Sequence, residues 1–118
     1  MKGHLIISTS NELLCVAGAQ IIYIQADGNY SNMLISGGYI RQVTLQLHQV
    51  EEMIHKQLPD MRSHFIRVGK SVIININYLH FINIPRQQLL LKDGVDVQSQ
   101  SASKEALKLL KEHIDRIR

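Results

Sequence analysis

Aromatic residues, prolines, cysteines and long apolar runs are all scarce in this chain of 118 residues. Tryptophan is absent, Tyr and Phe together number six, and only two prolines occur. Leucine, isoleucine and valine must therefore fill the core. No apolar run approaches the ~20 residues of a membrane-spanning helix, and residues 1–4 lack the apolar stretch of a secretion signal. We expect a soluble, cytoplasmic protein that does not enter a membrane.

The single cysteine also excludes a disulfide within the chain. Cys15 lies in the apolar run Leu13–Val16, where burial disfavours the reactive thiolate. We expect Cys15 to be buried and inert rather than a nucleophile.

Charge is distributed unevenly along the chain. Residues 1–60 carry three Lys and Arg against five Asp and Glu, whereas residues 61–118 carry ten against five, within a formal net charge of +3. A positive field on one side of a protein favours nucleic acid or an anionic membrane as a partner. Basic proteins are common, so this asymmetry indicates a partner only together with a suitable site.

Short β-branched and apolar runs dominate the pattern and predict antiparallel strands. Turn residues separate them, with Gly37-Gly38 and Asp93-Gly94 the clearest hairpin signals. The predicted strands lie at residues 5–7, 13–16, 21–24, 30–35, 39–43, 81–84, 88–91 and 95–98, with further extended segments around residues 65–66 and 72–74. Residues 99–103 read as a polar bridge.

Two segments have helical periodicity instead. Apolar residues at spacings of three and four predict a short helix that is entered near Thr44 and ends at Pro59. A closing helix follows Ser101 or Ser103 as its cap. Its apolar stripe is Leu107, Leu110, Ile114 and Ile117. The predicted fold is mainly β, with about eight short strands in small, β-sandwich-like antiparallel sheets, one short internal helix and a C-terminal helix. No linker or repeat interrupts residues 1–118, which indicates one domain.

Motifs for catalysis, nucleotides and metals are incomplete. Gly69-Lys70-Ser71 imitates the end of a P-loop, but that motif requires a glycine five positions earlier, where His64 stands. His48 and His55 could share a helix face, yet no further ligand accompanies them at metal-binding spacing. No nucleophile motif is present. We therefore predict no enzyme, no cofactor and no metal.

Three polar segments adjoin predicted buried strands and are candidates for contacting DNA. They are residues 27–32, the Arg67–Ser71 turn and the start of the closing helix at Ser103 and Lys104. Asn can pair with adenine, Lys with guanine, and Ser with phosphate. Ordinary turns and solvated charges remain the alternative interpretation of the same segments.

The order of these pieces resembles the LytTR family of DNA-binding domains. The run Ile21–Tyr30, followed by Thr44-Leu45 and a helix, is similar to the first half of that domain. Residues 65–75 are similar to its signature F-x-R-x-H-R-S-x-x-V-N, with Gly69, Lys70 and Ile74 in place of His, Arg and Val. Ser103-Lys104 resembles the family's Ser-Arg pair, and the likeness spans about residues 5–115.

The resemblance implies a domain that inserts loops into successive major grooves of duplex DNA. Such domains are usually output modules of bacterial two-component response regulators and bind tandem repeats as homodimers, so a receiver domain in a longer protein is one implied partner. A stand-alone domain is the other possibility. The implied DNA-facing residues are Asn29, Tyr30, Ser31, Asn32, Arg67, Lys70, Ser71, Ser103 and Lys104. Asn75 is expected to be a structural cap.

The departures from the signature affect how DNA would be read. Gly69 removes a donor, and Lys at positions 70 and 104 replaces a bidentate fork with a point charge. Because a bidentate base contact contributes roughly 1–3 kcal/mol of discrimination, we expect binding weighted toward phosphates or an altered site sequence. A protein-interaction module that no longer reads bases is the main alternative. An RNA-binding module is less favoured because stacking aromatics are few.

Overall fold

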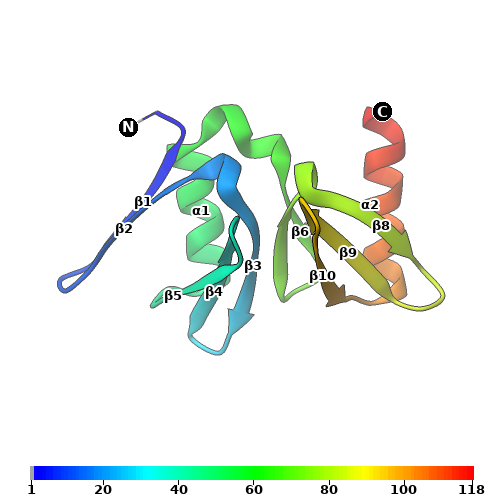
Figure 1. Ribbon diagram of the computed structural model, residues 1–118, viewed down its shortest axis with the longest axis horizontal. Helices are drawn as coiled ribbons and strands as arrows, with labels where there is room; N and C mark the ends of the chain where they lie inside the picture. Colours follow the sequence, from blue (N-terminus) through cyan, green and yellow to red (C-terminus); the bar gives the residue numbers. More distant parts are fainter. Residues whose placement is uncertain (1) are drawn as a thin grey trace.

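A five-stranded antiparallel sheet occupies the centre of the protein in the computed structural model, which describes residues 2–118 (Figure 1). Its strand order is β5-β4-β3-β7-β6, and two smaller sheets have the orders β1-β2 and β10-β9-β8. The strands are β1 (His4–Ser8), β2 (Leu13–Ala17), β3 (Ile21–Asp27), β4 (Tyr30–Ile35), β5 (Tyr39–Val43), β6 (Phe65–Val68), β7 (Val72–Asn75), β8 (Leu79–Asn83), β9 (Gln88–Asp93) and β10 (Asp96–Ser101).

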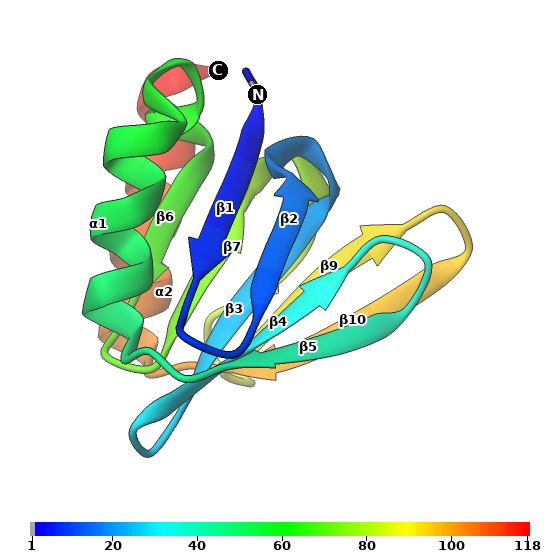
Figure 2. The same ribbon diagram turned by 90° about the vertical axis from the view of Figure 1, so that its left-hand side faces the viewer.

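Two α-helices and three 3-10 turns complete the described chain. They are η1 (Gly18–Gln20), α1 (Leu47–Gln57), η2 (Pro59–His64), η3 (Ile76–Tyr78) and α2 (Lys104–Ile117). Figure 2 shows α1 and the β1–β2 hairpin in front of the central sheet, while Figure 1 shows α2 and the three-stranded sheet on its other side. The mainly β fold of small antiparallel sheets is therefore confirmed.

Both faces of the central sheet are covered, and each has its own hydrophobic core. Ile73 of β7 packs with Val50 and Ile54 of α1 in one core, whereas its neighbour Ile74 packs with Leu107 of α2 in the other. Successive side chains of a strand point to opposite faces, so a strand buried on both faces reads as a continuous apolar run. That geometry accounts for the sequence Val72-Ile73-Ile74.

A bulge in β3 allows two consecutive side chains to pack into the same core. The pairing with β4 shifts between Ile21 and Tyr23, and Ile22 and Tyr23 both belong to the core beneath α2. A bulge places two residues opposite one, which interrupts the alternation of faces. The run of four buried residues at the start of β3 follows from this irregularity.

The hairpins form largely where the turn residues predict them. Gly37 and Gly38 both have positive φ values, of 100° and 86°, and they connect β4 to β5 between the predicted residues. Strands β8, β9 and β10 follow in meander order. The described chain has ten strands rather than about eight.

Several boundary predictions are wrong in detail. Helix α1 begins at Leu47 with Gln46 as its cap, because Gln46 and Gln49 form a reciprocal capping box. The predicted polar bridge at residues 99–103 is partly strand, since β10 continues to Ser101 by pairing with β9.

The start of α2 is confirmed, because Ser103, one of the two predicted caps, is its N-cap. Ile117 is 56% exposed, so the apolar stripe of α2 ends before the helix does.

Cys15 is exposed, contrary to the prediction. Its strand belongs to the two-stranded sheet, and only one side of that hairpin packs on the core, through Leu5, Ile7 and Val16. Alternation along β2 therefore turns Cys15 outward with the exposed Leu13. An apolar run on a hairpin covered on one side does not guarantee burial of every member.

Asn75 has the structural role predicted for it. The side chain is fully buried; its amide donates to the Ile21 carbonyl, and its Oδ1 accepts from the Asn77 backbone N–H. The first bond fastens the end of β7 to the start of β3, and the second caps η3. Within residues 2–118, no helix is both long and apolar enough to cross a membrane.

Candidate nucleic-acid interface

The three polar segments predicted from the sequence lie along one edge of the molecule. They are segment 1 (residues 27–32), segment 2 (residues 69–71, the part of the predicted Arg67–Ser71 turn that lies beyond β6) and segment 3 (residues 103–104). Figure 1 shows the β3–β4 turn, the β6–β7 turn and the start of α2 along its lower side. We call this surface the polar edge.

Segment 2 contacts residues that adjoin the other two segments. The Ala26 backbone N–H, next to segment 1, donates to the Ser71 carbonyl of segment 2 at 2.8 Å. A Cβ added at Gly69 would lie 3.8 Å from the Cβ of Ala106 in the first turn of α2. Gly69 and Ser103 also line the same open groove, of about 470 Å³. The segments are therefore neighbours rather than scattered features.

Segment 1 presents a hairpin tip whose polar side chains are held together. Asn32 donates to a carboxylate oxygen of Asp27 at 3.2 Å, and Gln42 of β5 donates to Asn32 Oδ1 at 3.3 Å. Gln46 donates to Asn29 Oδ1 at 3.3 Å. Asn29 and Tyr30 are exposed and Asn32 is half-buried. Asn29 and Tyr30 are thus the accessible members among the four residues of this segment predicted to face DNA, and Asp27 and Gly28 beside them are exposed as well.

Ser31 does not reach the surface. Its side chain is fully buried, and its hydroxyl donates to the Leu45 carbonyl at 2.8 Å. As the second residue of β4 it points inward, while Tyr30 and Asn32 on either side point outward. The prediction that Ser31 faces DNA is wrong in this conformation. It anchors the connection to α1 instead.

Segment 2 is a three-residue turn with a fixed backbone and exposed side chains. Val68 pairs with Val72 across it, and Gly69 has a φ of 64°, which glycine adopts without steric cost. Lys70 and Ser71 are exposed. Because β6 and β7 are tied into the central sheet, the turn holds both side chains at the polar edge.

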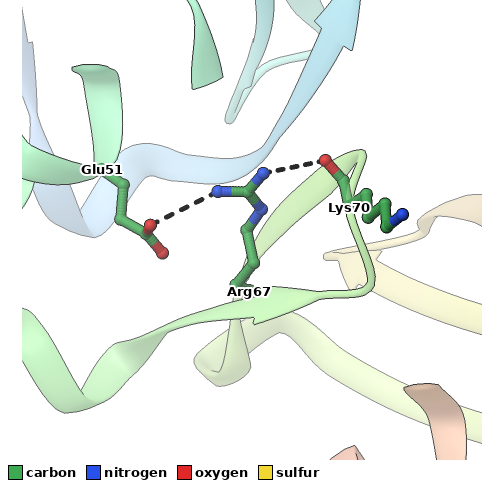
Figure 3. Close-up of polar contacts among 3 residues, drawn as sticks. All are labelled: Glu51, Arg67 and Lys70. Carbon is green, nitrogen blue, oxygen red and sulfur yellow. Dashed lines mark hydrogen bonds and ion pairs between the residues drawn. The ribbon is translucent and has the colours of Figure 1, made fainter. Parts of the chain in front are cut away.

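Arg67 occupies a different place from the one predicted. It lies in β6 rather than in the turn, and its guanidinium donates to the Lys70 carbonyl at 2.9 Å and to Glu51 of α1 at 3.4 Å (Figure 3). Its side chain is 32% exposed, and its Nε is buried without a hydrogen-bond partner. Arg67 therefore supports segment 2 from inside rather than extending from it.

Segment 3 is the beginning of α2. The Ser103 hydroxyl oxygen accepts from the Ala106 backbone N–H at 3.1 Å and so caps the helix, while its own O–H remains available as a donor. Lys104 is the first helical residue and is exposed, as are Glu105 and Lys108. Backbone N–H groups and the helix dipole make such a terminus favourable for a phosphate.

The polar edge can donate to an anion from several directions. Its exposed cations are Lys70 and Lys104, with exposed Lys108 one helical turn further along α2. Its exposed neutral donors include Asn29, Ser71 and Ser103. The acids at the edge are Asp27, which accepts from Asn32 and Gln42, and Glu105. Among residues 2–118, no three His, Cys, Asp or Glu side chains are grouped so that they could hold a metal ion.

Sequence reasoning missed three side chains that organise this edge. Gln46 could have been identified from the spacing to Gln49, which is that of a capping box. Gln42 follows from hairpin register, because it pairs with Asn32 once the Gly37-Gly38 turn is set. The contact of Glu51 with Arg67 joins residues 16 apart in sequence, and no local pattern signals it.

Comparisons with known proteins bear on the chain as a whole. The family model described as the LytTr DNA-binding domain matches residues 11–115. A solved structure from Bacillus cereus, described as the LytTr DNA-binding domain of a methyl-accepting/DNA response regulator, superposes with a TM-score of 0.68 and 16% sequence identity. The superposed region covers 97% of this chain and 98% of the Bacillus cereus chain. No curated protein sequence matches significantly.

Proposed function

The chain belongs to the LytTR family of DNA-binding domains, and from this premise we propose that it binds specific duplex DNA sequences through the polar edge and thereby regulates transcription. The observation that carries the proposal is that the β3–β4 turn, the β6–β7 turn and the start of α2 lie along one edge (Figure 1). Asn29, Lys70 and Lys104 belong to these three places in the chain, and all three are exposed. Exposed donors on a rigid scaffold suit contacts with phosphates and base edges.

The arrangement supports contact with more than one part of a groove. A hairpin tip, a tight turn and a helix start are three narrow projections, and narrow projections can enter a major groove of about 12 Å width. We propose that Asn29 and Tyr30 approach bases, that Lys70 and Ser71 contact base edges or phosphate, and that Ser103 and Lys104 contact phosphate. Asn32 supports the tip from its side.

The expected readout is weighted toward phosphates. Gly69 adds no side-chain donor, and the Lys70 ammonium lacks the planar fork that reads guanine bidentately. Phosphate contacts supply affinity and orientation, whereas base contacts supply sequence discrimination. We propose that this chain discriminates its sites less sharply than a domain that carries Arg at the position of Lys70.

The wider biological role is proposed on the same basis. The chain would act in the bacterial cytoplasm as the output module of a two-component response regulator, alongside a receiver domain, and would bind tandem repeats as a homodimer. We assign it no catalytic activity and no cofactor. A chain that keeps this fold and recruits a protein partner without binding DNA would instead be an interaction module.

Selection from a library of random duplexes tests the proposal, followed by salt titration on the recovered sequence. The logarithm of the binding constant should fall against the logarithm of salt concentration with a slope near −0.9 per phosphate contact. Lys70→Ala should weaken binding about tenfold and reduce the slope by about 1.

Lys56→Ala is the matched control. It removes the same charge from the last turn of α1, which lies about 15 Å along the helix from Gln46 at the polar edge. Binding by this variant should change little. Equal losses in the two variants, or recovery of no duplex from the library, would refute the assignment of the polar edge to DNA.

A further inference from the structure

The two bonds of Arg67 connect an exposed turn to a helix that is distant in sequence. One amino group of the guanidinium donates to the backbone carbonyl of Lys70 at 2.9 Å, and the other lies 3.4 Å from Glu51 on α1 (Figure 3). The group therefore lies between the turn and the helix. The third nitrogen of the guanidinium, Nε, is buried and has no hydrogen-bond partner. The guanidinium as a whole is therefore not turned toward solvent.

The turn that Arg67 supports has a second anchor. The Ser71 carbonyl accepts from the Ala26 backbone N–H of β3 at 2.8 Å. Two successive carbonyls of segment 2 are therefore held, that of Lys70 by the Arg67 guanidinium and that of Ser71 by Ala26. The Lys70 and Ser71 side chains are nevertheless exposed. Such a turn has a fixed backbone and free side chains, which reduces the ordering cost of binding a partner.

Glu51 gives Arg67 its orientation. Both side chains are about one-third exposed, at 32% for Arg67 and 30% for Glu51, and a charged hydrogen bond is stronger in this setting than at a fully solvated surface. Arg67 also neutralises a carboxylate that would otherwise repel a nearby polyanion. The chain thus carries an acid beside its proposed DNA-binding turn without an uncompensated charge.

We infer that Arg67 and Glu51 are positioning residues for DNA binding, which act through the backbone of Lys70 and do not themselves contact DNA. This inference rests on the function proposed above. It predicts that removing Glu51, an acid, weakens the binding of a polyanion. Simple electrostatics predicts the opposite sign, since loss of a negative charge near DNA should strengthen binding.

Glu51→Ala and Glu52→Ala form a matched pair that separates these outcomes. Both variants remove one negative charge from the same helix, but Glu52 is exposed and lies about 100° further around the helix axis. The probe is a fluorescein-labelled pool of random 30-base-pair duplexes in low salt. Glu51→Ala should weaken binding about threefold to tenfold, whereas Glu52→Ala should leave it unchanged or strengthen it. Equal strengthening by both variants overturns the inference.

A double-mutant cycle identifies the route of action. Arg67→Lys keeps the positive charge but loses the fork that reaches two partners, and it should weaken binding about tenfold. In a Lys70→Ala background, Arg67→Lys should cause little further loss, because residues that act through one another are not additive. Independent, additive losses would show that Arg67 does not act through Lys70 and would overturn the inference.

Hydrogen exchange provides a readout that needs no DNA. Glu51→Ala and Arg67→Lys should speed exchange in the peptide containing residues 69–71 while the central strands stay protected, and thermal melts report whether each variant is folded. Unchanged exchange overturns the inference whatever the DNA result. If exchange accelerates but neither wild type nor Lys70→Ala binds the duplex pool, the proposed function fails and the positioning of the turn stands.

Discussion

Two asparagines of this chain have opposite environments. Asn29 lies on a hairpin tip and is exposed, whereas Asn75 lies at the end of a central strand and is fully buried. Asn75 bonds to two backbone groups, which compensates for its loss of hydration. Residue type alone therefore does not distinguish an exposed asparagine that is a candidate for contacting DNA from a buried one that stabilises the fold.

Ser31→Ala tests this distinction within segment 1. The substitution removes the hydroxyl that donates to the Leu45 carbonyl inside the protein, so urea denaturation should show a free energy of unfolding lower by about 1 kcal/mol. Affinity for duplex DNA, measured at a temperature where the variant is folded, should be close to that of wild type. A large loss of affinity with an unchanged free energy of unfolding would show that Ser31 takes part in binding DNA after all, and would contradict this prediction.

Helix α1 is the element that relates two of the three segments. Its cap residue Gln46 donates to Asn29 of segment 1, and Glu51, in the next turn, holds Arg67 beneath segment 2. Both contacts come from the half of the helix nearest the polar edge. The helix buries Leu47, Val50 and Ile54 against the central sheet, which gives these contacts a rigid base.

A separate set of contacts fastens the three-stranded sheet to the central sheet. Asp93 of β9 accepts from the Ser36 hydroxyl at 2.9 Å and from the Gly37 backbone N–H at 3.2 Å, at the β4–β5 turn. The Tyr78 hydroxyl donates to the Ala19 carbonyl in η1. Burial raises the pKa of Tyr78 above its ordinary 10.0, nearby Asp93 raises it further, and the Ser36 hydroxyl opposes both.

The raised pKa predicts destabilisation in alkali. Tyr78 keeps its proton to a higher pH in the folded state than in the unfolded state, so its contribution is complete below about pH 10 and is lost as pH rises above that value. Tyr78→Phe should be less stable than wild type by about 0.5–1.5 kcal/mol at pH 8, through loss of the hydroxyl bond.

The difference between the two proteins should shrink at pH 11 in urea denaturation. All other residues are identical in the two proteins, so their contributions cancel in the comparison. A difference that stays constant from pH 8 to pH 11 would show that Tyr78 has the same pKa folded and unfolded.

At the scale of the whole molecule, two cores share one sheet. The first lies beneath α1 and the β1–β2 hairpin, and the second lies between the sheet and α2 with the three-stranded sheet. Segments 1 and 2 are turns of the shared sheet, and segment 3 begins a helix of the second core. The relative placement of the three segments therefore depends on both cores.

Matched substitutions in β7 test whether the two cores unfold together. Ile73→Ala and Ile74→Ala remove the same atoms from opposite faces of one strand, and each should lower the free energy of unfolding by about 2–5 kcal/mol. We expect a single cooperative domain, so amide signals from both cores should disappear at the same urea concentration. Separate transitions for the two cores in either variant would contradict that expectation.

The positions of the elements could be predicted from sequence because they depend on local interactions. Gly37-Gly38 sets a hairpin through its permitted φ values, Pro59 follows the end of a helix, and Val72-Ile73-Ile74 requires burial on both faces. Predictions failed where distant neighbours decide. The exposure of Cys15 depends on what packs against its hairpin, and the burial of Ser31 depends on which face of β4 meets the connection to α1.

The sequence by itself determined the mainly β pattern, the hairpin turns, the two amphipathic helices and the family to which the chain belongs, because each is expressed in residues close together along the chain. Only the tertiary structure decided which polar groups of those segments reach solvent. Arg67 stands in the recognised motif, yet Glu51 and the Lys70 carbonyl draw it inward. Long-range hydrogen bonds compete with solvent for each side chain, and their outcome follows from packing rather than from local sequence.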